Sequence, residues 1–313
     1  MATQIKELSF RKYLEGSATE KNEFTKELFS GLKECGFVIL KDHDVSEELL
    51  DEAYEKSRQF FSLSTKIKES YLCPEGGGQR GYTPFGTEHA KDADVHDLKE
   101  FWHVGQLLEP GHPKYEGYAK NLWPKEVPYF QQTFSALFKT LENVGQTMLQ
   151  ALTPALDLPQ RYFTDLTNDS NSILRLLHYP PIPEGTDPRC VRAAAHEDIN
   201  LITILVAAST SGLELLDRQG QWVPVETARH NLIVDAGDML SRITNEVIPS
   251  TTHRVVNPND GENSSRYSMP FFMHPHPDAM LTCIESCRGD GAKYPDITSQ
   301  EFLNQRLREI GLM

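Results

Sequence analysis

The expected fold of this chain rests on residues 196–206, which read His-Glu-Asp-Ile-Asn-Leu-Ile-Thr-Ile-Leu-Val. The apolar second half of this stretch predicts a short buried β-strand, and the polar residues lie directly before the start of this strand. In an extended chain, residues two apart point to the same side. His196 and Asp198 can therefore hold one ion between them, while Glu197 points away.

A third candidate ligand, His253, lies further along the chain and opens the β-prone run of residues 254–256. Two histidines and one carboxylate on one face of a metal are the ligand set of non-heme Fe(II) oxygenases, which leave coordination positions free for an oxidisable acid and for oxygen. A histidine beside a strand is by itself more often a surface or hydrogen-bonded residue. The prediction of a metal site therefore requires a barrel that brings His253 next to His196 and Asp198.

A second His-x-Asp string, residues 276–278, shows that the short pattern alone is weak. Prolines flank this string and no histidine follows it, so it is predicted to be an exposed loop. The remaining histidines carry no comparable pattern, and His178 is expected to pack against neighbours or to face solvent.

Arg266 and Ser268 stand two residues apart in a β-prone run and share one face of the expected strand. An arginine buried in a barrel must meet an anion, because an unpaired buried charge is costly. One interpretation is a structural ion pair with an Asp or Glu side chain. Beside a metal with open positions, a carboxylate-bearing cosubstrate, held by a two-point guanidinium contact, is the favoured interpretation.

The first part of the chain is predicted to be mostly helical, because apolar residues recur there at helical spacing. Between these helices, residues 37–40 indicate a short buried strand, and residues 73–97 are rich in glycine and charge and are predicted to be loop. The expected helices cover residues 20–33, 128–156 and 299–309, and one more starts at Ser46.

From residue 171 the sequence changes to short β-prone runs separated by turn signals. Many short strands at this spacing predict an all-β barrel or jelly roll. The chain is therefore expected to have a mainly β core with flanking α-helices. The expected strands cover residues 173–179, 201–206, 213–216, 222–225, 232–234, 254–256 and 267–272.

The composition limits the kinds of partner. The chain has 313 residues, 39% of them hydrophobic, and a formal net charge of −14. No nucleic-acid partner is expected, because binding a phosphate backbone needs clustered lysine and arginine. No membrane insertion is expected either, because no apolar run approaches the roughly 20 residues of a membrane helix. Residues 1–15 contain no signal-peptide core.

Five cysteines at irregular spacing argue against a disulfide framework and fit a reducing compartment. Cys283 and Cys287 stand four apart, but no second Cys/His pair stands nearby to complete a zinc site. We therefore expect ordinary thiols and a cytoplasmic protein.

Seven motifs follow one another along nearly the whole chain. They are Gly36-Phe37-Val38-Ile39-Leu40 with Asp42-His43-Asp44-Val45, Lys99-Glu100-Phe101-Trp102-His103-Val104, Leu177-His178-Tyr179-Pro180, His196-Glu197-Asp198, Gly237-Asp238-Met239-Leu240, His253-Arg254-Val255 and Arg266-Tyr267-Ser268. Together they resemble the isopenicillin N synthase-like branch of the 2-oxoglutarate/Fe(II)-dependent oxygenases. Asp42 and Asp44 stand where that family has Asn and Gly, and Leu177 stands where it has Asn.

The resemblance implies a distorted double-stranded β-helix of the jelly-roll class. It implies a mostly helical region at residues 1–155, packed on an oxygenase core with a C-terminal helix at residues 156–313, the two forming one compact unit. With Leu177 in place of the family's Asn, one polar contact near the cosubstrate is missing.

The resemblance also implies roles for the site residues. It implies Fe(II) held by His196, Asp198 and His253, and 2-oxoglutarate bound to this iron by its keto-acid end. Arg266 and Ser268 would hold the far carboxylate of 2-oxoglutarate, and Tyr179 would donate a hydrogen bond to this cosubstrate.

The implied activity is that of a dioxygenase that uses O2, converts 2-oxoglutarate to succinate and carbon dioxide, and oxidises a small-molecule substrate, by default through hydroxylation. One alternative is an Fe(II) oxidase or cyclase without 2-oxoglutarate, in which Arg266 and Ser268 bind a carboxylate of the substrate itself. A second is a Zn(II) hydrolase with the same ligands, and a third is a non-catalytic binder of small molecules.

The glycine-rich segment of residues 76–82 is a further candidate for function. Such a site favours burial by a lid that excludes water. The segment is expected to form part of that lid or a wall of the substrate site, and a flexible surface loop is the alternative.

Overall fold

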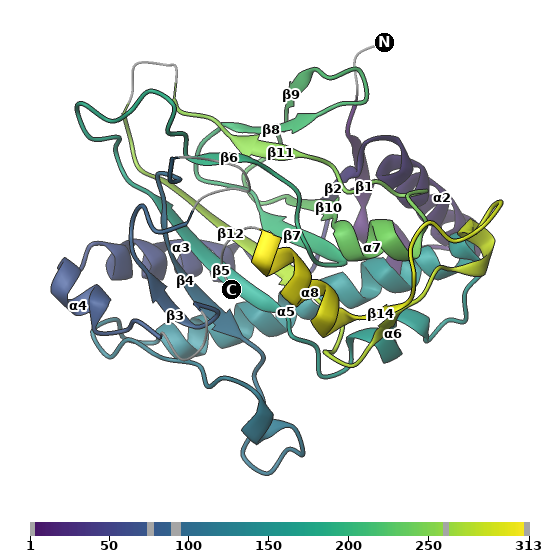
Figure 1. The fold of residues 1–313 in the computed structure, drawn as a ribbon, viewed down its shortest axis with the longest axis horizontal. Helices are drawn as coiled ribbons and strands as arrows, with labels where there is room; N and C mark the ends of the chain where they lie inside the picture. The colour runs from purple at the N-terminus through teal and green to yellow at the C-terminus, as the bar shows by residue number, and fades with distance from the viewer. Residues whose placement is uncertain (1–3, 74–77, 89–94, 259–262, 310–313) are drawn as a thin grey trace.

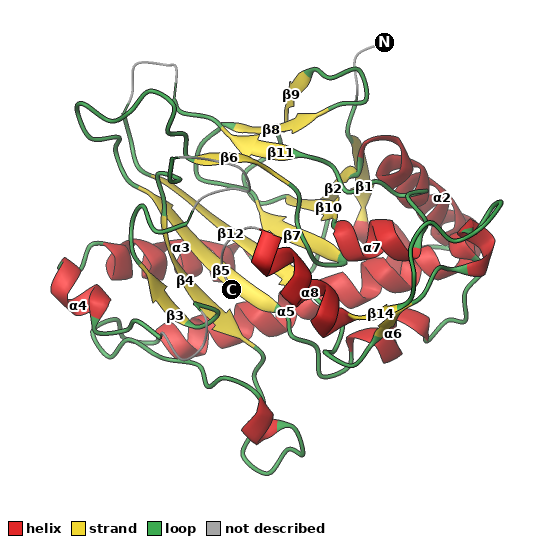
Figure 2. Ribbon diagram, in the orientation of Figure 1, coloured by secondary structure: helices red, strands yellow, loops and turns green. Residues whose placement is uncertain are grey.

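The fold is built around two β-sheets whose inner faces share a hydrophobic core, with helices on the outer face of the larger sheet (Figures 1 and 2). It was obtained as a computed structural model, which describes residues 4–73, 78–88, 95–258 and 263–309. The sheet-rich core with flanking helices is the jelly-roll class that the sequence predicts.

The larger sheet has eight strands, and half of them come from the first third of the chain. Its strands are β1 Lys6–Ser9, β2 Phe37–Lys41, β3 Gly81–Thr83, β4 Glu100–Gly105, β5 Ile173–Tyr179, β7 Ile202–Val206, β10 Leu232–Ala236 and β12 Arg266–Met273. Their spatial order is β1-β2-β10-β7-β12-β5-β4-β3. The division predicted at residue 155 therefore falls between strands of one continuous sheet.

The smaller sheet carries the candidate histidines. Its strands are β6 Ala193–His196, β8 Leu213–Leu216, β9 Trp222–Pro224 and β11 His253–Val255, in the order β6-β11-β8-β9. Apolar side chains of both sheets, such as Phe37, Leu177 and Leu215, form one buried cluster between them. A separate two-stranded pair joins β13 Met280–Leu281 to β14 Ile297–Thr298.

The long helices α2, α3 and α5 cover the outer face of the larger sheet, because each buries one apolar stripe. On α5, Phe138 packs edge-on against Phe271 of β12, with ring centroids 5.0 Å apart. Gly145 allows close approach, because a Cβ there would lie 2.5 Å from the sulfur of Met273. The helices are α1 Phe10–Glu15, α2 Ala18–Cys35, α3 Glu47–Phe61, α4 Thr65–Glu69, α5 Phe130–Leu152, α6 Tyr162–Thr167, α7 Asp238–Ile243 and α8 Ser299–Glu309.

Gly36 ends α2 and turns the chain into β2. Its φ of 71° lies in the left-handed region that favours glycine. An added Cβ would meet the hydroxyl oxygen of Thr251, the second residue before His253, at 2.3 Å. The turn is thus packed against the segment that leads into β11.

Most of the predicted strands and helices agree with the structure to within a few residues. The prediction of loop over residues 73–97 is wrong at Gly81–Thr83, which pairs with β4. The helix predicted over residues 128–156 is too long, because its last turn, Thr153–Leu156, is a 3₁₀ helix with Pro154 in it. Among the described residues, no helix combines the length and apolar character needed to cross a membrane.

Candidate active site

The three predicted metal ligands meet at one end of the smaller sheet. β6 and β11 are neighbours, and His253 is in register with His196. Asp198 follows β6, and its Oδ1 lies 3.8 Å from the Nε2 atom of each histidine. One candidate ligand atom from each residue lies within 4.8 Å of the other two, the one such cluster among the residues that the structure describes. The barrel closure that the prediction required is present.

Both histidines are oriented by backbone carbonyls. The Nδ1–H of His196 donates to the carbonyl of Ala194 at 2.7 Å, and the Nδ1–H of His253 donates to the carbonyl of Thr251 at 3.1 Å. With the proton on Nδ1, the lone pair of each ring is on Nε2, which faces Asp198. Ligating histidines in metal sites are fixed by this kind of outer hydrogen bond.

Asp198 is oriented from the larger sheet. The Oγ1 hydroxyl of Thr203 on β7 donates a short hydrogen bond to Oδ2 of Asp198, and the side-chain amide of Asn200 donates to Thr203 Oγ1 at 3.0 Å. Oδ1 is left to face the two histidines. Sequence reasoning missed the role of Thr203, and the signal available was its place on the strand that follows the motif.

The electrostatics of the site fit a bound divalent cation. Burial, and then the nearby His253 ring, lower the pKa of His196 to about 4, so this imidazole is neutral at neutral pH. Two imidazoles and one carboxylate, each with its second polar atom already hydrogen-bonded, suit a transition metal that keeps open positions. The edge of Phe37 against His253, with ring centroids 5.7 Å apart, gives the site an apolar wall.

Glu197 points away from the ligands, as the sequence predicts. Its carboxylate accepts a hydrogen bond from Thr252 Oγ1 at 3.0 Å and lies 3.9 Å from the guanidinium of Arg306 on α8. These contacts hold Glu197 outside the site, so it is no candidate for the general base of a zinc hydrolase.

Arg266 is a buried cation with no acidic partner among the described residues. It is 1% exposed; its Nη1 donates to Ser268 Oγ at 3.3 Å and its Nε donates to the carbonyl of Thr210 at 3.3 Å. The guanidinium lies 5.1 Å from the centre of the Tyr179 ring, which is in register with it on β5. Across the described ranges, no Asp or Glu forms an ion pair with Arg266. The predicted alternative of a structural ion pair is therefore wrong for these residues.

A buried charge network supports the candidate metal site from the side of β4, and sequence reasoning missed it. Lys99 Nζ lies 2.6 Å from Glu88 and 2.7 Å from Asp97. The other oxygen of Asp97 accepts the backbone N–H of Ala194 at 3.0 Å, and the carbonyl of Ala194 holds His196. Acidic residues in a segment predicted as loop thus fix the strand that ends at His196.

Arg175 on β5 joins this network on the inner face of the larger sheet. Its Nη atoms contact both oxygens of Glu88 at 3.1 and 3.3 Å, and its Nε donates to His103 Nε2 at 2.7 Å. Burial favours the neutral acid, yet the positive charges of Arg175 and Lys99 hold the pKa of Glu88 well below its ordinary value. The guanidinium lies 4.2 Å from the ring centre of Phe101.

Other candidates named from the sequence lie elsewhere. His178 faces the helices, where it bonds to Glu100 at 2.7 Å and stacks on Tyr267, so it packs as predicted. Leu177 is buried in register with Ser268. In the second His-x-Asp string Asp278 is exposed, but His276 is half-buried, so the prediction of an exposed loop is only partly right.

The glycine-rich segment of residues 76–82 begins outside the described residues, which resume at Gly78. The carbonyl of Gly78 accepts from Nδ1–H of His103 at 2.8 Å, and Tyr82 in β3 donates to Glu100 at 2.5 Å. The described part of the segment is therefore tied to β4, and its role as a lid or wall stays a prediction.

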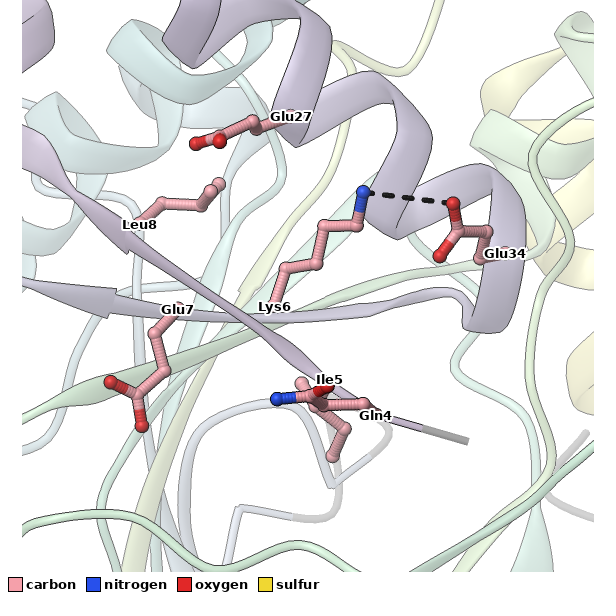
Figure 3. A pocket seen from close by; sticks show the side chains of 7 residues that line it. All are labelled: Gln4, Ile5, Lys6, Glu7, Leu8, Glu27 and Glu34. Carbon is pink, nitrogen blue, oxygen red and sulfur yellow. Dashed lines mark ion pairs between the residues drawn. The ribbon is translucent and has the colours of Figure 1, made fainter. Parts of the chain in front are cut away.

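A hollow on the molecular surface lies away from these residues. It is lined by residues of β1 and α2, where Lys6 and Glu34 form an ion pair at 3.6 Å (Figure 3). None of the metal-ligand candidates lines it, so it is not the active site.

Comparison with known proteins agrees with this geometry. The profile of the 2OG-Fe(II) oxygenase superfamily matches residues 170–275, and that of the N-terminal region of the non-haem dioxygenase in morphine synthesis matches residues 7–126. A 2-oxoglutarate-Fe(II) type oxidoreductase ppzD of Metarhizium rileyi is 30% identical, over 97% of this chain and 90% of its own. The chain therefore belongs to the 2-oxoglutarate/Fe(II)-dependent oxygenases.

Two solved structures are similar over almost their full length. A 2OG-Fe(II) oxygenase family protein from Caulobacter crescentus is 43% identical, with a TM-score of 0.88, over 99% of this chain and 100% of its own. A full-length Neurospora crassa protein, solved in complex with alpha-KG, is 30% identical, with a TM-score of 0.87, over 97% of this chain and 95% of its own. This chain is an enzyme that uses Fe(II), 2-oxoglutarate and O2 to oxidise a small-molecule substrate.

Proposed function

We propose that His196, Asp198 and His253 are the iron ligands of this dioxygenase. The observation that carries the proposal is the convergence of their three ligand atoms within 4.8 Å. In support, the second polar atom of each side chain is already hydrogen-bonded, which directs the remaining atom toward the common centre. Two histidines and one carboxylate would occupy one face of the iron and leave coordination positions for cosubstrate and oxygen.

Arg266 and Ser268 hold the far carboxylate of 2-oxoglutarate, and Tyr179 donates a hydrogen bond to the same cosubstrate. In support, Arg266 is 1% exposed and lacks an acidic partner in the described part of the chain. Leaving a buried charge unpaired is costly, so an incoming carboxylate gains an interaction that the fold has prepared. The guanidinium can present two parallel N–H groups to it.

The reaction is the hydroxylation of a small molecule, in which 2-oxoglutarate, O2 and the substrate C–H give succinate, carbon dioxide and the substrate C–OH. Iron supplies the oxygen chemistry when bound, and the chain supplies binding, orientation and exclusion of water. In support of a small substrate, one structure of the Neurospora relative holds thymine. The buried Arg266 and Ser268 keep the cosubstrate carboxylate away from bulk water.

The protein acts in the cytoplasm and does not bind nucleic acid. In support, all five cysteines lie within the described ranges as free thiols, as expected in a reducing compartment. The net charge of −14 disfavours a nucleic-acid backbone.

The test is an anaerobic visible spectrum of the protein with Fe(II), recorded before and after addition of 2-oxoglutarate. A new metal-to-ligand charge-transfer band is expected, because the keto acid would be a ligand of the bound metal. The band should disappear in His253→Ala and need far more 2-oxoglutarate in Arg266→Ala. Loss of one charged hydrogen-bond pair of about 1.5–3 kcal/mol corresponds to roughly a 10- to 150-fold weaker cosubstrate affinity.

His112→Ala is the matched control, since His112 is part-exposed and pairs with Asp169 away from the site. It should leave the band unchanged. An unaltered band in His253→Ala would contradict the ligand assignment. A normal 2-oxoglutarate titration in Arg266→Ala would contradict the assignment of the carboxylate site.

A further inference from the structure

A second fully buried arginine, Arg80, has no anion assigned to it. It is 1% exposed, like Arg266. Its Nε donates to the carbonyl of Ala119 at 3.2 Å and its Nη1 donates to the carbonyl of Gln79 at 2.7 Å. Within the described residues these two carbonyls are its hydrogen-bond partners, and no carboxylate pairs with it. A guanidinium has five N–H donors, so several remain for a ligand.

The described residues around Arg80 do not neutralise its charge. Among the described residues, the titratable groups that face it are the thiol of Cys73, the imidazole of His103 and the phenol of Tyr118, which donates its own proton to the carbonyl of Asp169 at 2.6 Å. Burial lowers the pKa of Arg80 to about 10, which still leaves it charged at neutral pH. A buried and unneutralised cation is costly unless an anion joins it.

The fold reserves space for this guanidinium at Gly105. A Cβ built on Gly105 would lie 1.8 Å from Cζ of Arg80, so the guanidinium lies directly on the backbone of β4. Asn121 clamps this position, because its side chain accepts the N–H of Gly105 at 2.7 Å and donates to its carbonyl at 3.0 Å. The guanidinium therefore packs against a backbone position that Asn121 fixes.

The register of the sheet relates Gly105 to the metal site. Gly105 pairs with Ile173, Ile173 with Phe272, and Phe272 with Thr203, whose hydroxyl holds Asp198. Neighbouring strands are about 4.8 Å apart, so Gly105 lies about 14 Å from Thr203 along this row. Arg80 therefore lies beside the row of residues that ends at the metal ligands, within the span of a small molecule.

The two buried arginines lie at different ends of the strands. Arg266 and Phe272 are six positions apart on β12, which corresponds to roughly 20 Å of extended strand. A single 2-oxoglutarate molecule bound at Arg266 is too short to reach Phe272 and Gly105 as well. A second anion is needed to occupy Arg80.

The row between Gly105 and Thr203 carries two apolar side chains, Ile173 and Phe272. Phe272 is half-buried on the inner face, whereas Phe271 on the outer face is fully buried. Arg175 nearby is already paired with Glu88 and His103, so it does not offer a free charge to a ligand. A ligand in this region would meet an aromatic ring in its middle and a cation at its far end.

We propose that Arg80 binds an anionic group, a carboxylate or a phosphate, of the primary substrate, whose apolar part lies along Phe272 toward the metal. This inference rests on the proposed function and names the substrate class of the same site. The anion at Arg80 then belongs to the substrate, and the anion at Arg266 is the carboxylate of 2-oxoglutarate.

The test uses the full chain with Mn(II) in place of Fe(II) and saturating 2-oxoglutarate, so that Arg266 is occupied and no turnover occurs. Benzoate, phenyl phosphate and neutral benzamide are titrated by calorimetry at constant ionic strength. At least one of the two anions should bind tenfold or more tightly than benzamide. The preferred anion then tells carboxylate from phosphate substrates.

Two variants remove the site in different ways. Arg80→Met should weaken binding of the preferred anion at least tenfold and leave benzamide unchanged. Gly105→Ala should do the same with the charge retained, because the added Cβ displaces the guanidinium. Arg242→Met is the control, since Arg242 is a part-buried arginine on α7 that donates to the carbonyl of Pro295 at 2.7 Å.

Equal binding of anions and benzamide to the unaltered protein would overturn the proposal, as would equal anion binding by Arg80→Met. Anion binding that 2-oxoglutarate abolishes would assign the anion to Arg266 instead. If Arg80→Met does not fold, the anion affinities of Gly105→Ala and Arg80→Lys, measured against benzamide, decide the question. The Fe(II) charge-transfer band of these variants should match that of the unaltered protein. If the unaltered protein shows no such band, the proposed function is refuted, and the proposal for Arg80 is decided by the anion titrations instead.

Discussion

Replacement of Thr203 by valine should weaken metal binding without disturbing the fold. Valine has the shape of threonine and keeps the β-strand preference of this position on β7. What it removes is the hydroxyl that donates to Oδ2 of Asp198 and accepts from Asn200. Asp198 then loses the contact that turns Oδ1 toward His196 and His253.

The magnitude follows from the type of hydrogen bond. A hydrogen bond to a charged acceptor contributes about 1.5–3 kcal/mol, and 1.4 kcal/mol corresponds to about tenfold in affinity. Asp198 and Thr203 are 8% and 2% exposed, so water cannot easily replace the lost donor. The expected loss of Fe(II) or Mn(II) affinity is therefore about 10- to 100-fold, the usual range for a partner that orients a ligand.

The assay is an anaerobic titration of metal-free protein with Mn(II), with the unfolding midpoint in urea measured in parallel. Thr203→Ser keeps the hydroxyl and loses one methyl group, and it should retain metal affinity within a few-fold. Metal affinity of Thr203→Val equal to that of the unaltered protein would refute the argument that Thr203 orients Asp198. Weak binding in both variants would assign the effect to packing instead.

Two further outcomes concern stability. Metal-free protein should lose stability as the pH falls from about 6.5 to 4, because burial lowers the pKa of His196 and of His274 to about 4 and the unfolded chain then binds more protons. The free energy of unfolding in urea should fall by about 1.4 kcal/mol per pH unit for each histidine as the pH is lowered. A free energy that does not change with pH, or an equal slope in His274→Asn, would contradict this. Gly36→Ala should cost more than the ~1–2 kcal/mol of left-handed strain, because its Cβ would also meet Thr251 at 2.3 Å. Gly220→Ala, with a φ of 74° and open space around it, isolates the strain, and an equal loss in both would refute the added clash.

The strands of the second half were predictable because their side chains alternate or form short apolar runs between turn residues. β5 and β8 agree residue for residue with the prediction. β6 was not predicted, because its sequence, Ala-Ala-Ala-His, has no β-branched residue. It is a strand because β11 pairs with it. Pairing of this kind depends on a partner far away in the sequence and is not visible in local preference.

The same difference between local sequence and distant neighbours applies to the residues of the site. The candidate ligands and Arg266 were identified from residue type, order and spacing, which are properties of the chain itself. Thr203 and Asp97 were missed because a threonine in a strand and an aspartate in a polar segment are ordinary residues. Their importance comes from the atoms they face, Oδ2 of Asp198 and the N–H of Ala194.

The sequence by itself therefore determined the class of fold and the donor atoms of the candidate metal ligands, since strand periodicity and donor atoms are local properties of the chain. Only the tertiary structure decided that His253 and His196 stand in register, that Arg266 and Arg80 have no acidic partner among the described residues, and that Phe272 faces inward. Burial and pairing are properties of neighbours supplied by other strands. A charge becomes a binding site only when those neighbours remove water and leave it without a counter-charge.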